Sequence, residues 1–395
     1  MLTFRFGTTL SQMTDPAIEK SGQKQPTPKF TFELLQILRG LAALIVIGYH
    51  CHSAGDEYFR TFPFRRIFAF GLFGVDFFFV LSGFIITYIH LDDLKRRTSL
   101  ASFIRKRFFR IYPIYWVVAV LTFVYIVLFA QGHIDHDSRI LHWNDSGDWL
   151  YVIRCFFLLP QPAMPMVDVS WTLNYELLFY FVFAICIMLG WKFARIVWVA
   201  WVVLILAHNL GFWNTDQYFL NFIFSPLIVE FLMGCLLAFL FVRQKIRLTI
   251  PLFVLLISML GIFAVIYLRI FDHQFGREQW NYVLIIGGAI LAVWTAASVD
   301  KSRKLAGTRW GLLMLLGNAS YSIYLIHTLV IRIIFTAARN VLGEATFQNN
   351  TSHVNLLSIL SASLAIVIGI ILHLQVEKPL LKYTNRTFLP ERQTT

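Results

Sequence analysis

Residues 38–50 read LRGLAALIVIGYH, which places an arginine and a histidine inside the first long apolar run. Arg39 and His50 are separated by 11 steps, which at about 100° per residue return to within about 20° of the starting direction. Both side chains therefore share one face of the expected helix, about 16 Å apart along its axis. An arginine in a membrane helix costs roughly 2.5–3.5 kcal/mol on insertion scales. Either the pair is functional, or Arg39 snorkels to the nearer interface and His50 marks the far one.

The composition around this run is that of an integral membrane protein. Hydrophobic residues make up 57% of the chain and charged residues only 14%, and the mean hydropathy is +0.65. A soluble core could not absorb that much apolar sequence without long spans. The net charge of +12 does not indicate a nucleic-acid partner, because the basic residues are scattered between apolar runs instead of forming one stripe.

The chain contains ten segments long enough to cross about 30 Å of hydrocarbon as helices. They are 33–53, 68–91, 111–131, 170–190, 193–210, 220–242, 249–269, 281–299, 311–336 and 354–376. Lysine and arginine are concentrated in the loops that follow the even-numbered spans, so the positive-inside rule places both termini in the cytoplasm. We therefore predict an all-α fold, a polytopic membrane helical bundle of about ten transmembrane helices.

The segments outside the spans suggest three parts. Residues 1–30 are polar and carry three prolines, which favours a mobile cytoplasmic tail; 31–380 would form the membrane domain and 381–395 a cytoplasmic C-terminal tail. The external connection 132–169 is aromatic and acidic, long enough for a lid or an interfacial platform. Its cluster His133, Asp135, His136 and Asp137 has metal-capable side chains but no fixed periodicity, so we expect a solvated turn and no metal.

Two carboxylates lie inside later spans and favour a functional role. Asp76 is several residues within the second span, where an unpaired carboxylate would be expensive. Glu176 shares a helix face with Tyr180, four residues on. A buried glutamate beside a histidine could orient the imidazole and raise its basicity, which is the arrangement of a general base. The alternative for Glu176 is a structural ion pair with Arg39 or Arg332.

Small and basic residues add further candidates. Ser82 and Gly83 suit close helix approach, so packing is their favoured interpretation. Arg105, Arg107 and Arg110 are spaced along an amphipathic segment that enters the third span. Guanidinium groups bind phosphates bidentately, but a cytoplasmic loop would be basic in any case, and both interpretations stay open.

The ninth span contains further polar residues on one helix face, and two other histidines are isolated in the sequence. Ser320, Tyr324 and His327 fall on one face at offsets of four and three. His327 alone is more typical of an interhelical hydrogen bond than of a catalyst. His208 and His373 receive no role.

Taken together, these segments resemble the acyltransferase 3 family of polytopic membrane acyltransferases. Six motifs in the family's order carry the resemblance. They are Arg39 with His50; Gly74-Val75-Asp76 with Ser82-Gly83-Phe84; Arg107-Phe108-Phe109-Arg110-Ile111-Tyr112-Pro113; Ser170-Trp171-Thr172-Leu173 with Glu176; Ser320-Tyr321-Ser322-Ile323-Tyr324-Leu325-Ile326-His327; and Glu377-Lys378-Pro379.

The resemblance implies transfer of an acyl group, usually acetyl from cytoplasmic acetyl-CoA, to a hydroxyl of a carbohydrate at the outer face. It also implies that Arg39 and His50 are the family's essential pair. We expect the stand-alone type, without the extra esterase-like domain of many relatives, in a bacterial cytoplasmic (inner) membrane. The implied partners are a surface or lipid-linked glycan, such as lipopolysaccharide or exopolysaccharide, and membrane lipid.

Acyl transfer from a thioester needs a base for the hydroxyl proton and a cation or dipole for the developing oxyanion. His50 would be that base or would carry the acyl group transiently, with its tautomer set by Glu176 or Asp76. Arg39 would stabilise the thioester or oxyanion, or meet the pantetheine or phosphate part of CoA. The donor's nucleotide end would be held by Arg105, Arg107 and Arg110, with Ser82 also on the donor side.

A membrane transporter of a sugar or lipid could use the same buried charges. It would show substrate counter-flow and no dependence on CoA. The sequence contains no sign of a repeated half, which weakens an inverted-repeat transporter. A structural membrane subunit is disfavoured by the density of ionisable groups within the spans.

Overall fold

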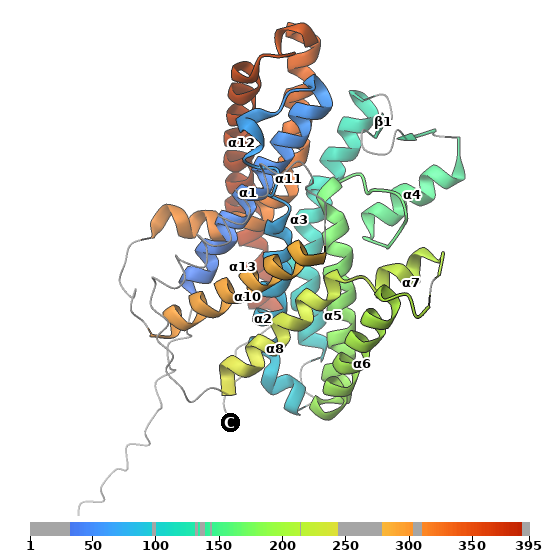
Figure 1. The fold of residues 1–395 in the computed structure, drawn as a ribbon, viewed down its shortest axis with the longest axis vertical. Coiled ribbons are helices and arrows are strands. Elements are labelled where there is room, and N and C mark those ends of the chain that lie inside the picture. The colour runs from blue at the N-terminus through green and yellow to red at the C-terminus, as the bar shows by residue number, and fades with distance from the viewer. Residues whose placement is uncertain are drawn as a thin grey trace, which may run out of the picture. The chain divides into compact units, whose positions relative to one another are not determined.

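The computed structural model describes residues 32–96, 100–130, 133–134, 139–142, 144–213, 215–243, 279–302 and 310–388. This part of the chain is helical apart from short turns and one small hairpin (Figure 1). The hairpin pairs β1 (His133–Ile134) with β2 (Arg139–Ile140) in antiparallel fashion. Of the external cluster expected to form a solvated turn, Asp135, His136 and Asp137 lie outside the described residues.

Twelve α-helices are described. They are α1 (Glu33–Phe59), α2 (Phe73–Arg96), α3 (Leu100–Leu128), α4 (Ser146–Phe156), α5 (Trp171–Leu189), α6 (Trp191–Asn209), α7 (Tyr218–Ile223), α8 (Leu227–Arg243), α10 (Gln279–Ser302), α11 (Gly311–Leu342), α12 (Thr351–Leu372) and α13 (Lys378–Phe388). A π-helical turn over His373–Glu377 joins α12 to α13.

Eight stretches of the described chain are long and apolar enough to cross a membrane as helices. They are Glu33–Phe59, Phe73–Lys95, Leu100–Leu128, Asp168–Leu189, Trp191–Asn209, Tyr218–Arg243, Gly311–Leu342 and Thr351–Thr384. They overlap eight of the ten predicted spans. The predicted span 281–299 forms α10, a helix outside these eight, and 249–269 lies outside the described residues. The all-α, polytopic fold class is confirmed.

Helix α1 is held against α11 at a close crossing of two glycines. A Cβ added at Gly40 would come within 2.9 Å of the Gly317 nitrogen. One added at Gly317 would come within 2.1 Å of the Gln36 carbonyl oxygen. Membrane helices approach this closely through small residues, because apolar side chains gain little from leaving lipid. The crossing fixes the N-terminal part of α1, which carries Arg39.

The same helix begins at a carboxylate from α10. Helix α1 has no capping side chain of its own. The Asp300 carboxylate instead accepts hydrogen bonds from Leu34 N at 3.0 Å and Leu35 N at 3.3 Å. These are two of the backbone donors that a helix start leaves unpaired, and a negative charge there also suits the helix dipole. Asp300 thereby fixes where α1 begins.

Gly83 makes the second close crossing, between α2 and α8. A Cβ there would lie 2.0 Å from the Phe231 carbonyl oxygen, and one at Gly234 would lie 2.1 Å from the Val80 carbonyl oxygen. The packing interpretation is therefore right for Gly83. Its neighbour Ser82 instead faces a cavity. One residue separates the two roles, because adjacent helical side chains point about 100° apart.

Helix α3 begins well before the predicted third span. The sequence predicts a span from residue 111, but the helix starts at Leu100 and continues through Pro113. The basic segment is therefore helical, and Arg107 and Arg110, three residues apart, lie on one face. The Arg107 group contacts His90 of α2 and Tyr180 of α5, and the Arg110 group contacts Tyr321 of α11.

Candidate active site

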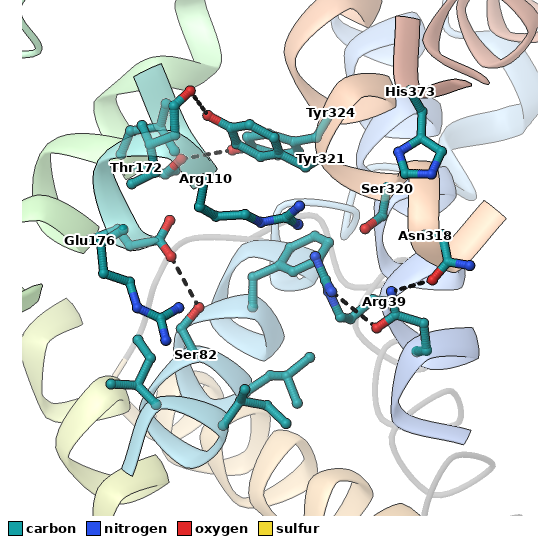
Figure 2. Close-up of a pocket in the computed structure, with 18 of the residues that line it drawn as sticks. Arg39, Ser82, Arg110, Thr172, Glu176, Asn318, Ser320, Tyr321, Tyr324 and His373 are labelled. Carbon is teal, nitrogen blue, oxygen red and sulfur yellow. Dashed lines mark hydrogen bonds between the residues drawn. The ribbon is translucent and has the colours of Figure 1, made fainter. Parts of the chain in front are cut away.

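One cavity of the described chain, which we call the arginine cavity, has a volume of about 520 Å³. It lies among α1, α2, α3, α5, α11, the π-helical turn after α12 and the start of α13 (Figure 2). Its polar lining consists of Gln36, Arg39, Ser82, Arg107, Arg110, Thr172, Glu176, Tyr180, Asn318, Ser320, Tyr321, Tyr324, His373 and Lys378. Figure 2 shows the guanidinium groups of Arg39 and Arg110 pointing into the same space.

Arg39 is held from its own helix and from the start of α11. Its Nη1 donates to Gln36 Oε1 at 3.0 Å. The Gln36 amide in turn donates to Gly317 O at 3.1 Å and to Asn318 Oδ1 at 2.9 Å. The amide of Gln36 is thus oriented with its oxygen toward the arginine. This orientation depends on the α1–α11 crossing, because only a close backbone approach brings Gly317 O within reach.

Arg110 is held by a buried carboxylate in the π-helical turn. Its guanidinium donates to Glu377 and stacks over the Tyr321 ring at 5.1 Å. Glu377 is only 2% exposed and also contacts Ser322 Oγ and His373 Nδ1, each at 2.8 Å. A buried carboxylate with three hydrogen-bonding neighbours is well satisfied. Arg110 therefore reaches the cavity in a fixed orientation.

Arg107 is oriented by a histidine and an aspartate of α2. Its Nη2 lies 3.2 Å from His90 Nε2, and His90 Nδ1 lies 2.7 Å from Asp93 Oδ2. A guanidinium can only donate, so His90 Nε2 accepts and Nδ1 carries the proton that goes to Asp93. The Arg107 group also lies over the Tyr180 ring at 5.4 Å. A row of hydrogen bonds thus runs from Asp93 through His90 to Arg107, which lines the cavity.

Glu176 is the carboxylate among the charged groups of the cavity lining. It lies 3.5 Å from Ser82 Oγ and accepts a hydrogen bond from the Tyr180 hydroxyl. Its surroundings include the guanidinium groups of Arg39 and Arg110, which interact with it electrostatically. The lining as a whole is therefore positively charged, with four cationic side chains against one anionic one.

A second, smaller cavity surrounds His50, and we call it the histidine pocket. Its volume is about 30 Å³. The lining consists of His50, Ser53, Ala54, Glu57, Tyr58, Asp168, Thr328, Ile331 and Arg332. Arg332 donates to both carboxylate oxygens of Asp168, at 3.2 and 3.3 Å. Arg332 therefore pairs with Asp168, and the suggested ion pair of Glu176 with Arg332 is wrong.

Two imidazoles meet beside this pocket. The ring centroids of His50 and His327 are 4.9 Å apart, with an angle of 63° between the ring planes. His327 is completely buried in α11, and its Nδ1 lies 2.7 Å from the Tyr324 carbonyl oxygen. The Tyr324 side chain lines the arginine cavity, where its hydroxyl lies 3.0 Å from Thr172 Oγ1. Tyr324 thus lies between the two cavities.

The structure divides the predicted site residues between these places. Arg39, Ser82, Arg107, Arg110 and Glu176 line the arginine cavity. His50 lines the histidine pocket.

Asp76 is buried in α2 between cavity-lining neighbours, and Arg105 is partly exposed on α3. Neither is part of the lining of the two cavities. Glu176 and His50 line different cavities, so the contact by which Glu176 would set the tautomer of His50 is not formed in this structure.

Several supporting residues went unrecognised in the sequence. His373 receives no role there, yet it lines the arginine cavity and contacts Glu377. Its spacing of four from Glu377 was a usable signal, as was the spacing of three between His90 and Asp93. The Asp168–Arg332 pair had no such signal, since its members are 164 residues apart. In the part of the chain that the structure describes, no group of His, Cys, Asp and Glu could hold a metal ion.

Known proteins resemble this chain over most of its length. A family model described as an acyltransferase domain, that of the acyltransferase 3 family, matches residues 33–374. The exopolysaccharide production protein ExoZ of Rhizobium meliloti (strain 1021) is 29% identical over 328 residues, which are 80% of this chain and 91% of that protein.

Two further relatives are similar at lower identity. The acyltransferase MdmB of Streptomyces mycarofaciens is 26% identical over 88% of this chain and 91% of its own length. The O-acetyltransferase OatA of Staphylococcus aureus is 26% identical over 82% of this chain and 54% of its own length. No solved structure matches this chain at a significant level.

Proposed function

Since the chain belongs to the acyltransferase 3 family of membrane O-acyltransferases, we propose that it moves an acetyl group from cytoplasmic acetyl-CoA to a carbohydrate. The acceptor would be a hydroxyl of a cell-surface or lipid-linked glycan, and the site of action the bacterial cytoplasmic membrane. The names of two relatives support this choice, because one takes part in exopolysaccharide production and another is an O-acetyltransferase.

The observation that carries the proposal is the convergence of Arg39, Arg107 and Arg110 on one cavity. A volume of about 520 Å³ lies in the usual range of ligand sites, about 300–1,000 Å³. Coenzyme A is polyanionic, and guanidinium groups match phosphate oxygens in geometry and charge. We assign the donor to the arginine cavity, with Arg107 and Arg110 at its phosphates and Arg39 toward its pantetheine arm.

The acceptor chemistry is assigned to His50. The attacking hydroxyl oxygen forms a bond to the thioester carbonyl carbon while its proton passes to the imidazole, and the carbon–sulfur bond then breaks. The sulfur leaves as a thiolate and takes that proton from the imidazolium, which returns His50 to its neutral form. His50 suits this role because it lines a pocket of its own, beside the paired charges of Asp168 and Arg332. Asp76 and Arg105 carry no step in this proposal.

Acetyl transfer in a reconstituted membrane tests the proposal. Purified protein in liposomes receives radiolabelled acetyl-CoA and a glycan fraction from the host, and label in the glycan is measured. We expect transfer by the wild type, none above background by His50→Ala, and wild-type transfer by His353→Gln. His353 is a matched control because it is exposed at the start of α12 and lines neither cavity.

The same liposomes distinguish a transporter. Counter-flow of a sugar or lipid that needs no acetyl-CoA, together with absence of label in the glycan, would contradict the proposed acyl transfer. Replacement of acetyl-CoA by succinyl-CoA and longer acyl-CoA donors measures the acyl specificity in the same assay.

A further inference from the structure

The protonation of the His327 ring follows from its neighbours. Nδ1 lies 2.7 Å from the Tyr324 carbonyl oxygen, which can only accept a hydrogen bond. Nδ1 therefore carries the proton. In a neutral imidazole the other nitrogen then holds a lone pair, so Nε2 is a hydrogen-bond acceptor. The backbone of α11 thus sets the tautomer of this ring.

That acceptor has no donor. His327 Nε2 is buried and has no hydrogen-bond partner among the described residues. Buried polar atoms in folded proteins are nearly always paired, and an unpaired one calls for an explanation such as a catalytic role. The Tyr324 ring is 5.8 Å away between centroids, and its hydroxyl is engaged with Thr172.

His50 is the titratable side chain placed to supply the missing donor. Its ring is 4.9 Å from that of His327 between centroids, and it lines the histidine pocket while His327 does not. Asp168, which lines the same pocket, accepts hydrogen bonds from Arg332. His327 Nε2 offers His50 a neutral acceptor, in the place where the histidine of a hydrolase triad meets a buried aspartate.

We propose that His327 is a positioning residue whose Nε2 accepts a hydrogen bond from the second N–H of His50 when His50 becomes charged. This rests on the proposed function, in which His50 takes the proton of the acceptor hydroxyl. The O–H bond breaks, the proton binds one nitrogen of His50, and the other nitrogen, already protonated, donates to His327. The imidazolium keeps both protons until it gives one of them to the leaving thiolate. Ring rotation closes the pair, since such contacts are often long before substrate binds.

A neutral acceptor suits a base that lies beside an existing ion pair. It stabilises the imidazolium and orients the ring, and it adds no further charge to a pocket that Asp168 and Arg332 already line. His327 acts through His50, because it is completely buried while His50 reaches the pocket. Its loss should therefore lower kcat and leave donor binding unchanged.

Two substitutions of His327 separate this role from packing. The amide of His327→Asn lies near the position of Nδ1 and can still donate to Tyr324 O, but it leaves no acceptor at the position of Nε2. The longer His327→Gln places an amide oxygen there. We expect His327→Asn to lower kcat about 100-fold, within the range for proton-transfer catalysis, and His327→Gln less than about 10-fold. KM for acetyl-CoA should stay at its wild-type value in both.

Equal kcat values for the two variants would overturn the inference, as would a loss that falls on KM. Wild-type protein labelled with 15N at histidine gives a second measurement that is independent of how the variants fold. Its nitrogen chemical shifts should identify His327 as the Nδ1–H tautomer, and an Nε2–H tautomer would overturn the inference too. Failure of wild-type acyl transfer, or full activity of His50→Ala, would instead contradict the proposed function.

Discussion

The arginine cavity and the histidine pocket differ in size and in charge, although α1 contributes to both. The first has a volume of about 520 Å³ and a positively charged lining, while the second has about 30 Å³ and a neutralised ion pair, Asp168–Arg332. A space of 30 Å³ admits one or two water-sized groups, such as a hydroxyl. The difference shows how one helix can serve two functions at separate places. Arg39 lies where a large anion would bind, and His50 lies where a proton would be transferred.

The largest expected effect is on catalysis by the histidine pocket. His50→Ala should lower kcat about 10³-fold, because a positioned general base contributes roughly 10²–10⁴-fold. The dissociation constant of acetyl-CoA should remain unchanged, since His50 does not line the arginine cavity. Equilibrium binding and single-turnover transfer measure the two quantities separately. If His50→Ala weakened donor binding as much as it slowed transfer, the two cavities would be one functional site.

The second effect is on the stability of the protein and comes from a residue that holds Arg110 in the arginine cavity. Glu377→Ala removes the buried partner of Arg110 and should lower the free energy of unfolding by about 3–5 kcal/mol, the cost of breaking a buried ion pair. Glu344→Ala is the matched control, because Glu344 is exposed and pairs with exposed Gln348. Thermal unfolding in detergent ranks the three proteins. Similar stabilities for the two variants would show that Arg110 does not depend on Glu377.

A smaller effect, on KM for acetyl-CoA, is expected from loss of His90, which links Arg107 to Asp93. His90→Phe removes the acceptor of Arg107 and the link to Asp93, but keeps an aromatic ring against Phe103. KM for acetyl-CoA should rise about 10-fold, equivalent to about one hydrogen bond to a charged group, while kcat stays near its wild-type value. Steady-state kinetics give both values. A loss of kcat without a change of KM would place Arg107 in the transfer step.

The smallest effect concerns the start of the shared helix. Asp300→Ala removes the acceptor for Leu34 N and Leu35 N and should cost about 1 kcal/mol of stability, as loss of a helix cap does. Asp300→Asn, which keeps one oxygen acceptor, should lose less. Chemical denaturation in detergent compares the two. Equal losses in Asn and Ala would mean that the negative charge, and not the hydrogen bonds, stabilises the start of α1.

Helical periodicity predicted neighbouring side chains correctly where both residues lie on the same helix. Hydropathy identified eight of the ten predicted spans. Periodicity predicted that Ser320, Tyr324 and His327 share a face, which agrees with the two cavity-lining residues and the His50 contact. It grouped Arg105, Arg107 and Arg110, of which Arg107 and Arg110 line the arginine cavity and Arg105 does not. It misjudged the start of α3, because a basic amphipathic helix and a basic loop have similar composition.

The sequence by itself determined the helical membrane class, the family resemblance and the face shared by Arg39 and His50, because hydropathy and helical periodicity are local properties. Only the tertiary structure decided which cavity each residue lines and which partner each charge meets. Asp300 reaches the start of α1 across 266 residues, and Asp168 meets Arg332 across 164. Such pairings depend on how helices cross, and the crossings are set by backbone approach at glycines such as Gly40 and Gly317.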